Sequence, residues 1–467
     1  MSDYGSDVED DSEFTLANVG FDRRFPLDIS FAMEMSATNC VPPATRRDAS
    51  RSTPPTDAIA DARSLLPALL FPSAARRGGQ VQGGRRDRQQ CVPAPGAFFP
   101  SRNPGPRCCF SLTTRPVSPS PVSLAEALAA CIAACKPGAK VADICGLGDK
   151  TIEEEAAKFY NKKDKDGNKI DKGIAFPTCV SVNNQVCHNS PEDDDTTVLE
   201  EGQAVKLDLG AHVDGYIAVV ANTVVLMGDM NAPVTGVQAD AMQAAITAGE
   251  AAIRKLRPGV SNQEVGKAIE RVAEDFGVHV VEGVLTHSMK RFVIDGNKVV
   301  LNKTSPELKA DDETIELNEV YALDIVMSSG EGKPKIQDEK ETNVYKRAIE
   351  KNYKLKMQAS RAVFSEISKK FPTMPFTMRA MGDIRGARLG LVECMKHELL
   401  HEYPVLYEKP GDAVAHFKAT VLVMQNGNDR ITTWTSQPIQ SDLELTDEDL
   451  KALIATPLKS KKKKAKK

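Results

Sequence analysis

The sequence has no apolar run approaching the roughly 18–20 residues needed to cross a bilayer, so we expect no membrane-spanning segment. Its acidic start, residues 1–13, lacks the basic and apolar regions of a secretory signal peptide. The 10 cysteines include no paired CxxC motif, which favours reduced thiols over a disulfide framework. Aromatic residues make up 5% of the chain and do not interleave with basic residues, which disfavours a base-stacking nucleic-acid platform. Together these absences predict a protein of the cytoplasm or nucleus.

Lysine is absent from the first part of the chain. Up to Cys135 there are 14 arginines and no lysine, whereas from Lys136 onward there are 10 arginines and 36 lysines. Residues from about 20 to 120 are also rich in proline, glycine and serine, and they lack helical or strand periodicity. Such a stretch buries too little apolar surface to offset its ordering entropy, so we predict disorder over 1–122. Two interpretations stay open, an Arg-rich RNA-binding arm and a disordered insertion that derives from translated non-coding sequence, and we favour the second.

Periodic structure begins at Ser123, which opens a capping box, a common start of a helix. That helix ends at Lys136-Pro137-Gly138, and an amphipathic helix follows over about 141–160. The arrangement recurs about 120 residues later, where Arg257-Pro258-Gly259 ends an Ala-rich helix and Ser261 opens another capping box. The repeat predicts a duplicated α/β unit.

Four segments have the alternation of strands, at residues 204–209, 216–226, 319–327 and 413–424. A turn at 212–215 joins the first two of these segments. Together with the helices between them, they predict an α/β sheet covered by helices.

A series of motifs agrees in type, order and spacing with one known family: Phe176-Pro177-Thr178, Asn183-Asn184, Cys187-His188, Lys206-Leu207-Asp208-Leu209-Gly210, Gly215-Tyr216-Ile217, Gly283-Val284-Leu285-Thr286-His287, Glu319-Val320-Tyr321-Ala322-Leu323-Asp324 and His416-Phe417-Lys418-Ala419-Thr420. Together they resemble the methionine aminopeptidases of the creatinase or pita-bread fold. The resemblance implies a duplicated α/β domain over 123–440, followed by a C-terminal segment, 441–467, with a basic tail.

The long gap between Asp324 and Lys418 resembles the type 2 enzymes of that family, which carry a mostly helical insert subdomain there. We place the insert at about 345–408. Its periodicity predicts helices over 353–371 and 387–402.

The family holds two divalent ions with five residues, mainly carboxylates, and a separate histidine faces the substrate. The ions share and activate one water, whose pKa their charge lowers. By resemblance, this chain retains His188, which faces the substrate, and the ligands Asp208 and His287. Asp324 stands for a glutamate and is shorter by one methylene. Val219 and Lys418 stand where the family has an aspartate and a bridging glutamate.

Lys418 has the largest consequence for this site. A unit charge pair at about 4 Å and an effective dielectric near 20 is worth roughly 4 kcal/mol. An ammonium in place of a carboxylate beside a dication therefore changes the energy by on the order of 15 kcal/mol. Val219 removes a further ligand. We predict that the site binds no metal or other cofactor and does not catalyse the reaction, and that its remaining polar residues are relics lining a cleft. The alternative is a working type 2 methionine aminopeptidase with an altered metal site.

This loss of ligands resembles one branch in particular, the proliferation-associated, ErbB-binding protein family. The resemblance extends to residues 328–333, to Met374-Pro375-Phe376-Thr377 and to the lysine-rich end. It implies a non-enzymatic protein that binds RNA and the large ribosomal subunit. It also implies roles in ribosome maturation, translation and growth control, in the cytoplasm and the nucleus or nucleolus. Transcription or signalling proteins are further implied partners, and a transcriptional co-regulator is an alternative function.

The last nine residues contain seven lysines: Lys459, Lys461, Lys462, Lys463, Lys464, Lys466 and Lys467. With the family resemblance, we predict that this tail contacts RNA backbone and directs the protein to the nucleus or nucleolus. Such attraction to phosphates is non-specific and strongly salt-dependent. The alternative is a tail that only increases solubility.

His397-Glu398-Leu399-Leu400-His401 matches the HExxH zinc pattern, in which two histidines one turn apart share a helix face. A zinc site also needs a third ligand, and Pro404 ends the helix before one is reached. We therefore interpret the motif as part of a helix packed by Leu399 and Leu400, and not as a zinc site.

Overall fold

The structure is a computed structural model that describes residues 124–459, except 162, 164–166, 307 and 433–436. The predicted disordered region 1–122, the cap at Ser123 and the tail lysines beyond Lys459 lie outside the described residues. Within the described part, the helices are too short or too polar to cross a membrane.

The described helices are α3 (Leu124–Ala134), α4 (Val141–Ala157), α5 (Gly236–Lys255), α6 (Asn262–Asp275), α7 (Gln358–Lys370), α8 (Ile384–Lys396) and α9 (Glu448–Ala455), with the 3-10 helices η3 (Glu339–Glu341) and η4 (Met378–Ala380). The large sheet contains β1 (Lys172–Val182), β3 (Ala204–Val213), β4 (Tyr216–Val225), β5 (His279–Val280), β6 (Leu285–Met289), β7 (Val299–Leu301), β8 (Val320–Ser328), β14 (Val414–Leu422) and β15 (Asp429–Arg430). Two small sheets contain β2 (Gln185–Cys187), β13 (Leu406–Tyr407) and β9 (Lys335–Ile336), and β11 (Phe376–Thr377), β10 (Val344–Arg347) and β12 (Leu400–Tyr403). The four predicted strands are confirmed to within a few residues, whereas β1 was not predicted.

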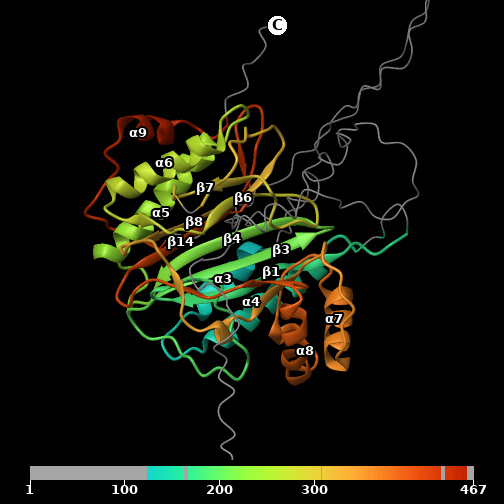
Figure 1. The fold of residues 1–467 in the computed structure, drawn as a ribbon. Coiled ribbons are helices and arrows are strands. Elements are labelled where there is room, and N and C mark those ends of the chain that lie inside the picture. The colour runs from blue at the N-terminus through green and yellow to red at the C-terminus, as the bar shows by residue number, and fades with distance from the viewer. Residues whose placement is uncertain (1–123, 162, 164–166, 307, 433–436, 460–467) are drawn as a thin grey trace, which may run out of the picture.

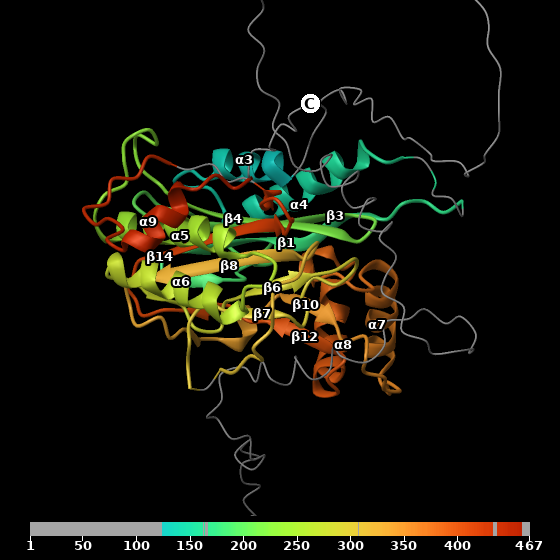
Figure 2. The same ribbon diagram turned by 90° about the horizontal axis from the view of Figure 1, so that it is seen from above.

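The large sheet has the main strand order β1-β3-β4-β14-β8-β6-β7, and every neighbouring pair is antiparallel. Helices α3 and α4 pack on β1, β3 and β4, while α5 and α6 pack on β14, β8 and β7 (Figure 2). Each helix pair encloses its own apolar cluster against its half of the sheet. The predicted duplicated α/β architecture is thereby confirmed, and the two halves meet where β4 lies beside β14.

Helix α6 illustrates how the local sequence determines these helices. Ser261 is its N-cap, and the Ser261 hydroxyl accepts a backbone N–H bond at 3.1 Å. Glu264 does not close the predicted capping box, because its carboxylate pairs with Lys255 Nζ at 3.0 Å. One face of the helix is apolar and buried, through Val265, Ile269 and Val272. Gly266 lies where a Cβ would overlap a carbonyl of β7, so glycine allows the helix to approach that strand closely.

The insert lies between β9 and β13 and has its own sheet and core. Strands β10, β11 and β12 form the sheet, and α7 and α8 pack on each other around an apolar cluster that includes Val363, Ile367, Leu391 and Cys394. Figures 1 and 2 both show α7 and α8 at one end of the molecule and α6 and α9 at the other. The predicted, mostly helical insert is confirmed, and a three-stranded sheet accompanies its helices.

The predicted helix over 387–402 is wrong at its C-terminal end. Helix α8 ends at Lys396, Glu398 has a positive φ of 54°, and Leu400–Tyr403 forms strand β12 beside β10. His397 stacks on a tyrosine ring of the insert with centroids 3.5 Å apart, whereas His401 faces a glutamate at 3.3 Å. The two histidines of the HExxH motif therefore share no helix face, because strand pairing overrides the helical pattern after residue 396.

Arg379, in η4, joins the insert to the N-terminal half of the domain. Its side chain is 7% exposed and donates hydrogen bonds to Asp149 Oδ2 at 2.8 Å, to Ser190 Oγ at 3.0 Å and to a main-chain carbonyl at 2.6 Å. A second arginine, Arg388 in α8, pairs with Glu192 at 2.5 Å, but its side chain is 59% exposed. We therefore expect Arg379 to contribute more than Arg388 to holding the insert in place.

Replacing Arg379 by methionine should lower the free energy of unfolding by about 2–3 kcal/mol, because hydrogen bonds from a buried charged donor are lost. Limited proteolysis should also cleave the insert of this variant faster than that of the unmodified protein. Arg388→Met is the matched control, with a smaller expected loss because the Arg388 side chain is 59% exposed to solvent. Equal losses in urea unfolding would contradict the anchoring role of Arg379.

Candidate functional site

Strands β3, β14 and β8 bring three of the predicted site residues into one row across the sheet. The strand register pairs Asp208 with Ala221 of β4, Ala221 with Lys418, and Lys418 with Asp324. Side chains of directly paired residues project from the same face of a sheet. Asp208, Lys418 and Asp324 therefore meet on one face, although they come from distant parts of the chain.

Lys418 lies between the two aspartates. Its Nζ donates to Asp208 Oδ2 at 2.6 Å and lies 2.8 Å from Asp324 Oδ2, and the three side chains are only 3–12% exposed. The same Nζ is 5.3 Å from the centroid of the Phe176 ring, within the range of a cation–π interaction. The other oxygen of Asp324 lies 2.6 Å from His416 Nε2. A buried ammonium thus joins two carboxylates at the position where the resemblance implies a bridging carboxylate.

The charges of this cluster stabilise one another. Burial alone lowers the pKa of Lys418, but the Asp208 and Asp324 carboxylates more than reverse that effect, so its pKa is raised. Burial alone raises the pKa of Asp324, but Lys418 and then His416 hold it well below its usual range. Lys418 is therefore an ammonium and Asp324 a carboxylate at neutral pH. An ammonium has no lone pair, so Lys418 cannot bind a metal or accept a proton in this state.

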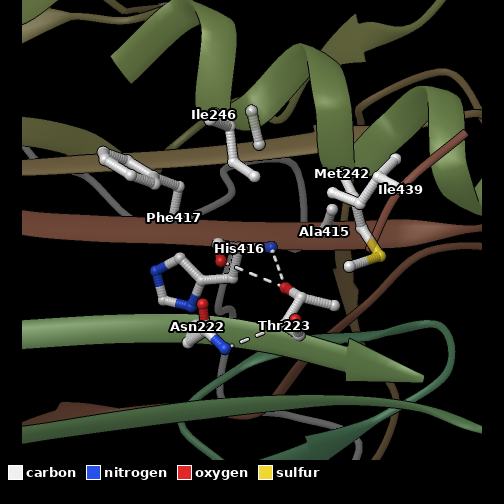
Figure 3. Close-up of a pocket in the computed structure, with 9 residues that line it drawn as sticks. Asn222, Thr223, Met242, Ile246, Ala415, His416, Phe417 and Ile439 are labelled. Atoms are coloured by element: carbon white, nitrogen blue, oxygen red, sulfur yellow. Dashed lines mark hydrogen bonds between the residues drawn. The ribbon is translucent and has the colours of Figure 1, made fainter. Parts of the chain in front are cut away.

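Threonine side chains add hydrogen bonds along the β4–β14 seam, the line where the two halves of the sheet meet beside Lys418. Backbone pairing between these strands covers only two residue pairs. Beyond it, Thr223 Oγ1 accepts a bond from His416 N at 2.7 Å and donates to His416 O at 3.0 Å, as Figure 3 shows. The Thr420 hydroxyl bridges the main chain of Val219 in the same way. The seam between the two halves is therefore hydrogen-bonded on both sides of Lys418.

A small cavity lies at this seam, between β4, β14 and helix α5 (Figure 3). Its volume is about 10 Å³, and its lining includes Thr223, Met242, His416 and Phe417. A cavity of that size holds about one water molecule, so it cannot admit a peptide. His416 Nδ1 is buried and has no hydrogen-bond partner within the described residues, while Nε2 of the same ring faces Asp324.

Val219 stands where the resemblance implies a second aspartate ligand. Its side chain is buried in an apolar cluster with Phe176, Ile217 and Met289. This position therefore supplies hydrocarbon and no oxygen ligand. The packing of the cluster, and not only the identity of one residue, opposes a charged group at this point.

The two predicted histidines take no part in the Lys418 ion pairs. His188 has a positive φ of 67°, its Nδ1 lies 3.1 Å from Pro404 O, and its ring is edge-on to Tyr403. Burial and then Lys418 lower the pKa of His188, so its imidazole is neutral at pH 7. His287 lies on β6, and its Nδ1 is buried without a hydrogen-bond partner in the described part of the chain. Their role as relics of a substrate pocket stays a prediction.

Four residues that contact the predicted site residues, directly or through one another, were not themselves predicted: His416, Tyr403, Asp295 and Lys346. The sequence carried a signal for His416, because residues two apart on a strand share a face. Asp295 accepts a hydrogen bond from the Tyr403 hydroxyl at 2.6 Å and pairs with Lys346. Tyr403 and Lys346 belong to β12 and β10 of the insert, so only the tertiary structure brings them to Asp295.

The residues present do not fit the two metal ions of the methionine aminopeptidases. Lys418 Nζ lies within hydrogen-bonding distance of both remaining aspartates, and Val219 offers no oxygen. Across the described part of the chain, no three His, Cys, Asp or Glu side chains converge in a way that could hold a metal ion. These residues therefore do not form the two-metal site of that family.

Known proteins share this architecture. The pattern of metallopeptidase family M24 matches residues 124–344. ErbB-3 binding protein 1 of Solanum tuberosum is 53% identical over 339 residues, which cover 72% of this chain and 86% of that protein. The curved DNA-binding protein of Schizosaccharomyces pombe is 41% identical over 342 residues, covering 71% of this chain and 87% of that protein. The solved structure of a thermophilic Arx1 superposes with a TM-score of 0.66 at 28% identity, over 72% of this chain and 95% of that one.

The fold and the central site therefore define a protein of the pita-bread class, related to metallopeptidase family M24. Within that class, the chain belongs to the proliferation-associated, ErbB-binding protein family.

Proposed function

We propose that this protein is a non-catalytic member of its fold class that binds RNA and the large ribosomal subunit. We further propose that it acts in ribosome biogenesis, translation and growth control, in the cytoplasm and the nucleus or nucleolus. The observation that carries the non-catalytic part is the buried pairing of Lys418 Nζ with Asp208 at 2.6 Å and with Asp324 at 2.8 Å. In this arrangement the two aspartates neutralise a lysine and are not free to hold ions that activate water.

Exposed basic side chains of the insert support the nucleic-acid part of the proposal. Helices α7 and α8 expose Lys369, Lys370, Arg385 and Lys396. A similar protein, from Schizosaccharomyces pombe, carries the name curved DNA-binding protein. Basic groups on one end of a domain attract the phosphate backbone without reading its sequence. RNA backbone and shape are the features that such a surface would recognise.

The end of the described chain is attached to the domain. Lys459 Nζ pairs with Asp429 at 2.8 Å, and Arg254 Nε donates to Thr456 O at 2.8 Å. The residues just before the tail are therefore attached to the domain. We propose that the lysines after this anchor bind RNA phosphates.

Removing residues 460–467 should weaken binding to ribosomes and to RNA, and should flatten the salt dependence of that binding. Each lost phosphate contact reduces the slope of log K against log salt by about 0.7–0.9. The measurement is co-sedimentation with ribosomes in sucrose gradients, and RNA binding at several salt concentrations. A variant in which the tail lysines are replaced by arginines is the matched control, because it keeps the charge. An unchanged slope after the truncation would contradict the proposal for the tail.

A second candidate function is a working type 2 methionine aminopeptidase with an altered metal site, because Asp208 and His287 retain ligand types. Metal analysis of the purified protein and an assay on a Met-Ala peptide with cobalt or manganese distinguish the two. We expect no stoichiometric cobalt or manganese at the Lys418 site and no turnover. The name of the Solanum relative, ErbB-3 binding protein 1, supports a signalling protein as a further partner. A role as transcriptional co-regulator is compatible with the same basic surfaces.

A further inference from the structure

Two carboxylates converge on Gly330, away from the Lys418 cluster. Gly330 follows β8, while Glu408 and Asp412 lie on the loop between β13 and β14. A Cβ atom at residue 330 would overlap the Asp412 carboxylate and lie 3.0 Å from Glu408 Oε2. Glycine is therefore required here for space, because both carboxylates approach its Cα.

Main-chain hydrogen bonds hold the two loops in this arrangement. Ser329 N donates to Ala413 O at 2.9 Å, and Ala413 N donates to Ser329 Oγ at 2.9 Å. Glu408 N donates to Asn184 O at 2.9 Å, and the Asn184 side chain returns a bond to Glu408 O at 2.8 Å. These bonds fix the two loops relative to each other, with both carboxylates against Gly330.

Both acids carry a buried oxygen without a partner. Glu408 is 3% exposed, and neither its Oε1 nor Asp412 Oδ2 has a hydrogen-bond partner within the described residues. The nearby lysines have other partners, since Lys409 Nζ pairs with Glu331 at 2.5 Å and Lys303 Nζ donates to Glu331 O at 3.1 Å. A buried carboxylate oxygen without a partner carries a substantial desolvation cost. A positively charged ligand would remove that cost for both acids.

We propose that Glu408 and Asp412 bind a hard divalent cation of the calcium type, which joins the loop after β8 to the loop before β14. Calcium prefers oxygen ligands and tolerates irregular geometry completed by main-chain carbonyls and water. Such completion is required, because no third His, Cys, Asp or Glu converges with these two acids in the described chain.

The test uses the full chain, stripped of metal with a chelating resin. Calorimetric titration with CaCl₂ should give one bound Ca²⁺ per chain, and thermal unfolding should shift to higher temperature in CaCl₂ than in EDTA at equal ionic strength. Glu408→Gln and Asp412→Asn should each weaken binding by about tenfold or more, because calcium affinity depends on the number of charged ligands. Gly330→Ala should weaken it without a change of charge. Glu331→Gln, which removes an exposed acid from the same loop, is the matched control and should bind normally.

Two results would overturn the proposal. The first is a wild-type chain that binds neither Ca²⁺ nor Mg²⁺ and unfolds at the same temperature in CaCl₂ and in EDTA. The two acids would then share a proton, in agreement with the raised pKa of Glu408 that burial and then Asp412 produce. The second is an equal loss of binding in Glu331→Gln and Glu408→Gln, which would mean diffuse attraction to an acidic surface. Circular dichroism of each variant establishes that it is folded.

Discussion

Replacing Lys418 by methionine should lower the free energy of unfolding by about 3–5 kcal/mol, because removing one partner of a buried ion pair leaves uncompensated charge. Methionine keeps most of the length of the side chain and its contact with Phe176. The lost group is the ammonium that lies 2.6 Å from Asp208 and 2.8 Å from Asp324. Both carboxylates would then be buried side by side without a cation. Urea unfolding at neutral pH measures the difference.

The loss caused by Lys418→Met should shrink as the pH is lowered. In the unmodified protein the pKa of Asp324 is depressed by Lys418 and His416. The Asp324 carboxylate therefore stabilises the folded state fully above its unfolded pKa of about 3.9, and this stabilisation is lost as the pH falls through the lower folded pKa. The pKa of Lys418 is raised. The Lys418 ammonium therefore stabilises the folded state fully below its unfolded pKa of about 10.4, and this stabilisation is lost only as the pH rises through the higher folded pKa. The ion pairs therefore contribute fully between about pH 4 and 10.

In the variant, repulsion between the carboxylates of Asp208 and Asp324 raises the pH at which one of them takes up a proton. That proton removes the repulsion, so the difference in unfolding free energy between the two proteins should decrease from pH 7 toward pH 4. A difference that is constant over this range would contradict the electrostatic account and would indicate lost packing instead.

Two control variants separate charge from volume. Lys409→Met removes a lysine whose side chain is 66% exposed and pairs with Glu331, and it should change the stability little. Adding Asp208→Asn and Asp324→Asn to Lys418→Met should restore part of the lost stability, because neutral groups do not repel one another. If Lys418→Met and Lys409→Met were equally stable, the Lys418 ion pairs would not be a main source of the protein's stability.

Restoring the missing ligand types should make the site bind metal. The double variant Val219→Asp with Lys418→Glu should bind Mn²⁺ or Co²⁺ at this site, whereas we expect the unmodified protein to bind neither ion there. Without metal the double variant should be less stable than the unmodified protein, because its carboxylates are buried together and one replaces Val219 in an apolar cluster. A metal concentration about 100-fold above its dissociation constant should return about 2.7 kcal/mol of stability.

The single variants are the controls for metal binding. Val219→Asp alone should bind no metal, because the Lys418 ammonium stays in the site. Lys418→Glu alone should bind more weakly than the double variant, since one ligand is still missing. Equilibrium dialysis with metal analysis, together with thermal unfolding, measures both effects independently of activity. Mn²⁺ or Co²⁺ bound in the unmodified protein and lost in a Lys418→Met variant would show that Lys418 does not exclude metal from this site.

Much of the central sheet was accessible from the sequence. The alternation of residues 204–209, 216–226, 319–327 and 413–424 predicted four strands, and all four form. Strand β1 was missed, because Pro177 interrupts the run and two register shifts disturb its pairing with β3. The HExxH segment misled the helix prediction, since a local pattern carries no information about pairing with β10.

The sequence by itself determined which charges are available at the centre of the sheet. It placed a lysine at 418, aspartates at 208 and 324, and an apolar residue at 219, and the spacing of their motifs put them on strands of one domain. Only the tertiary structure decided that one ammonium joins both aspartates and that His416 completes the cluster. The tertiary structure also decided that the insert docks through Arg379. These contacts join segments that are far apart in the chain, and their distances follow from strand register and packing, which short-range sequence patterns do not encode.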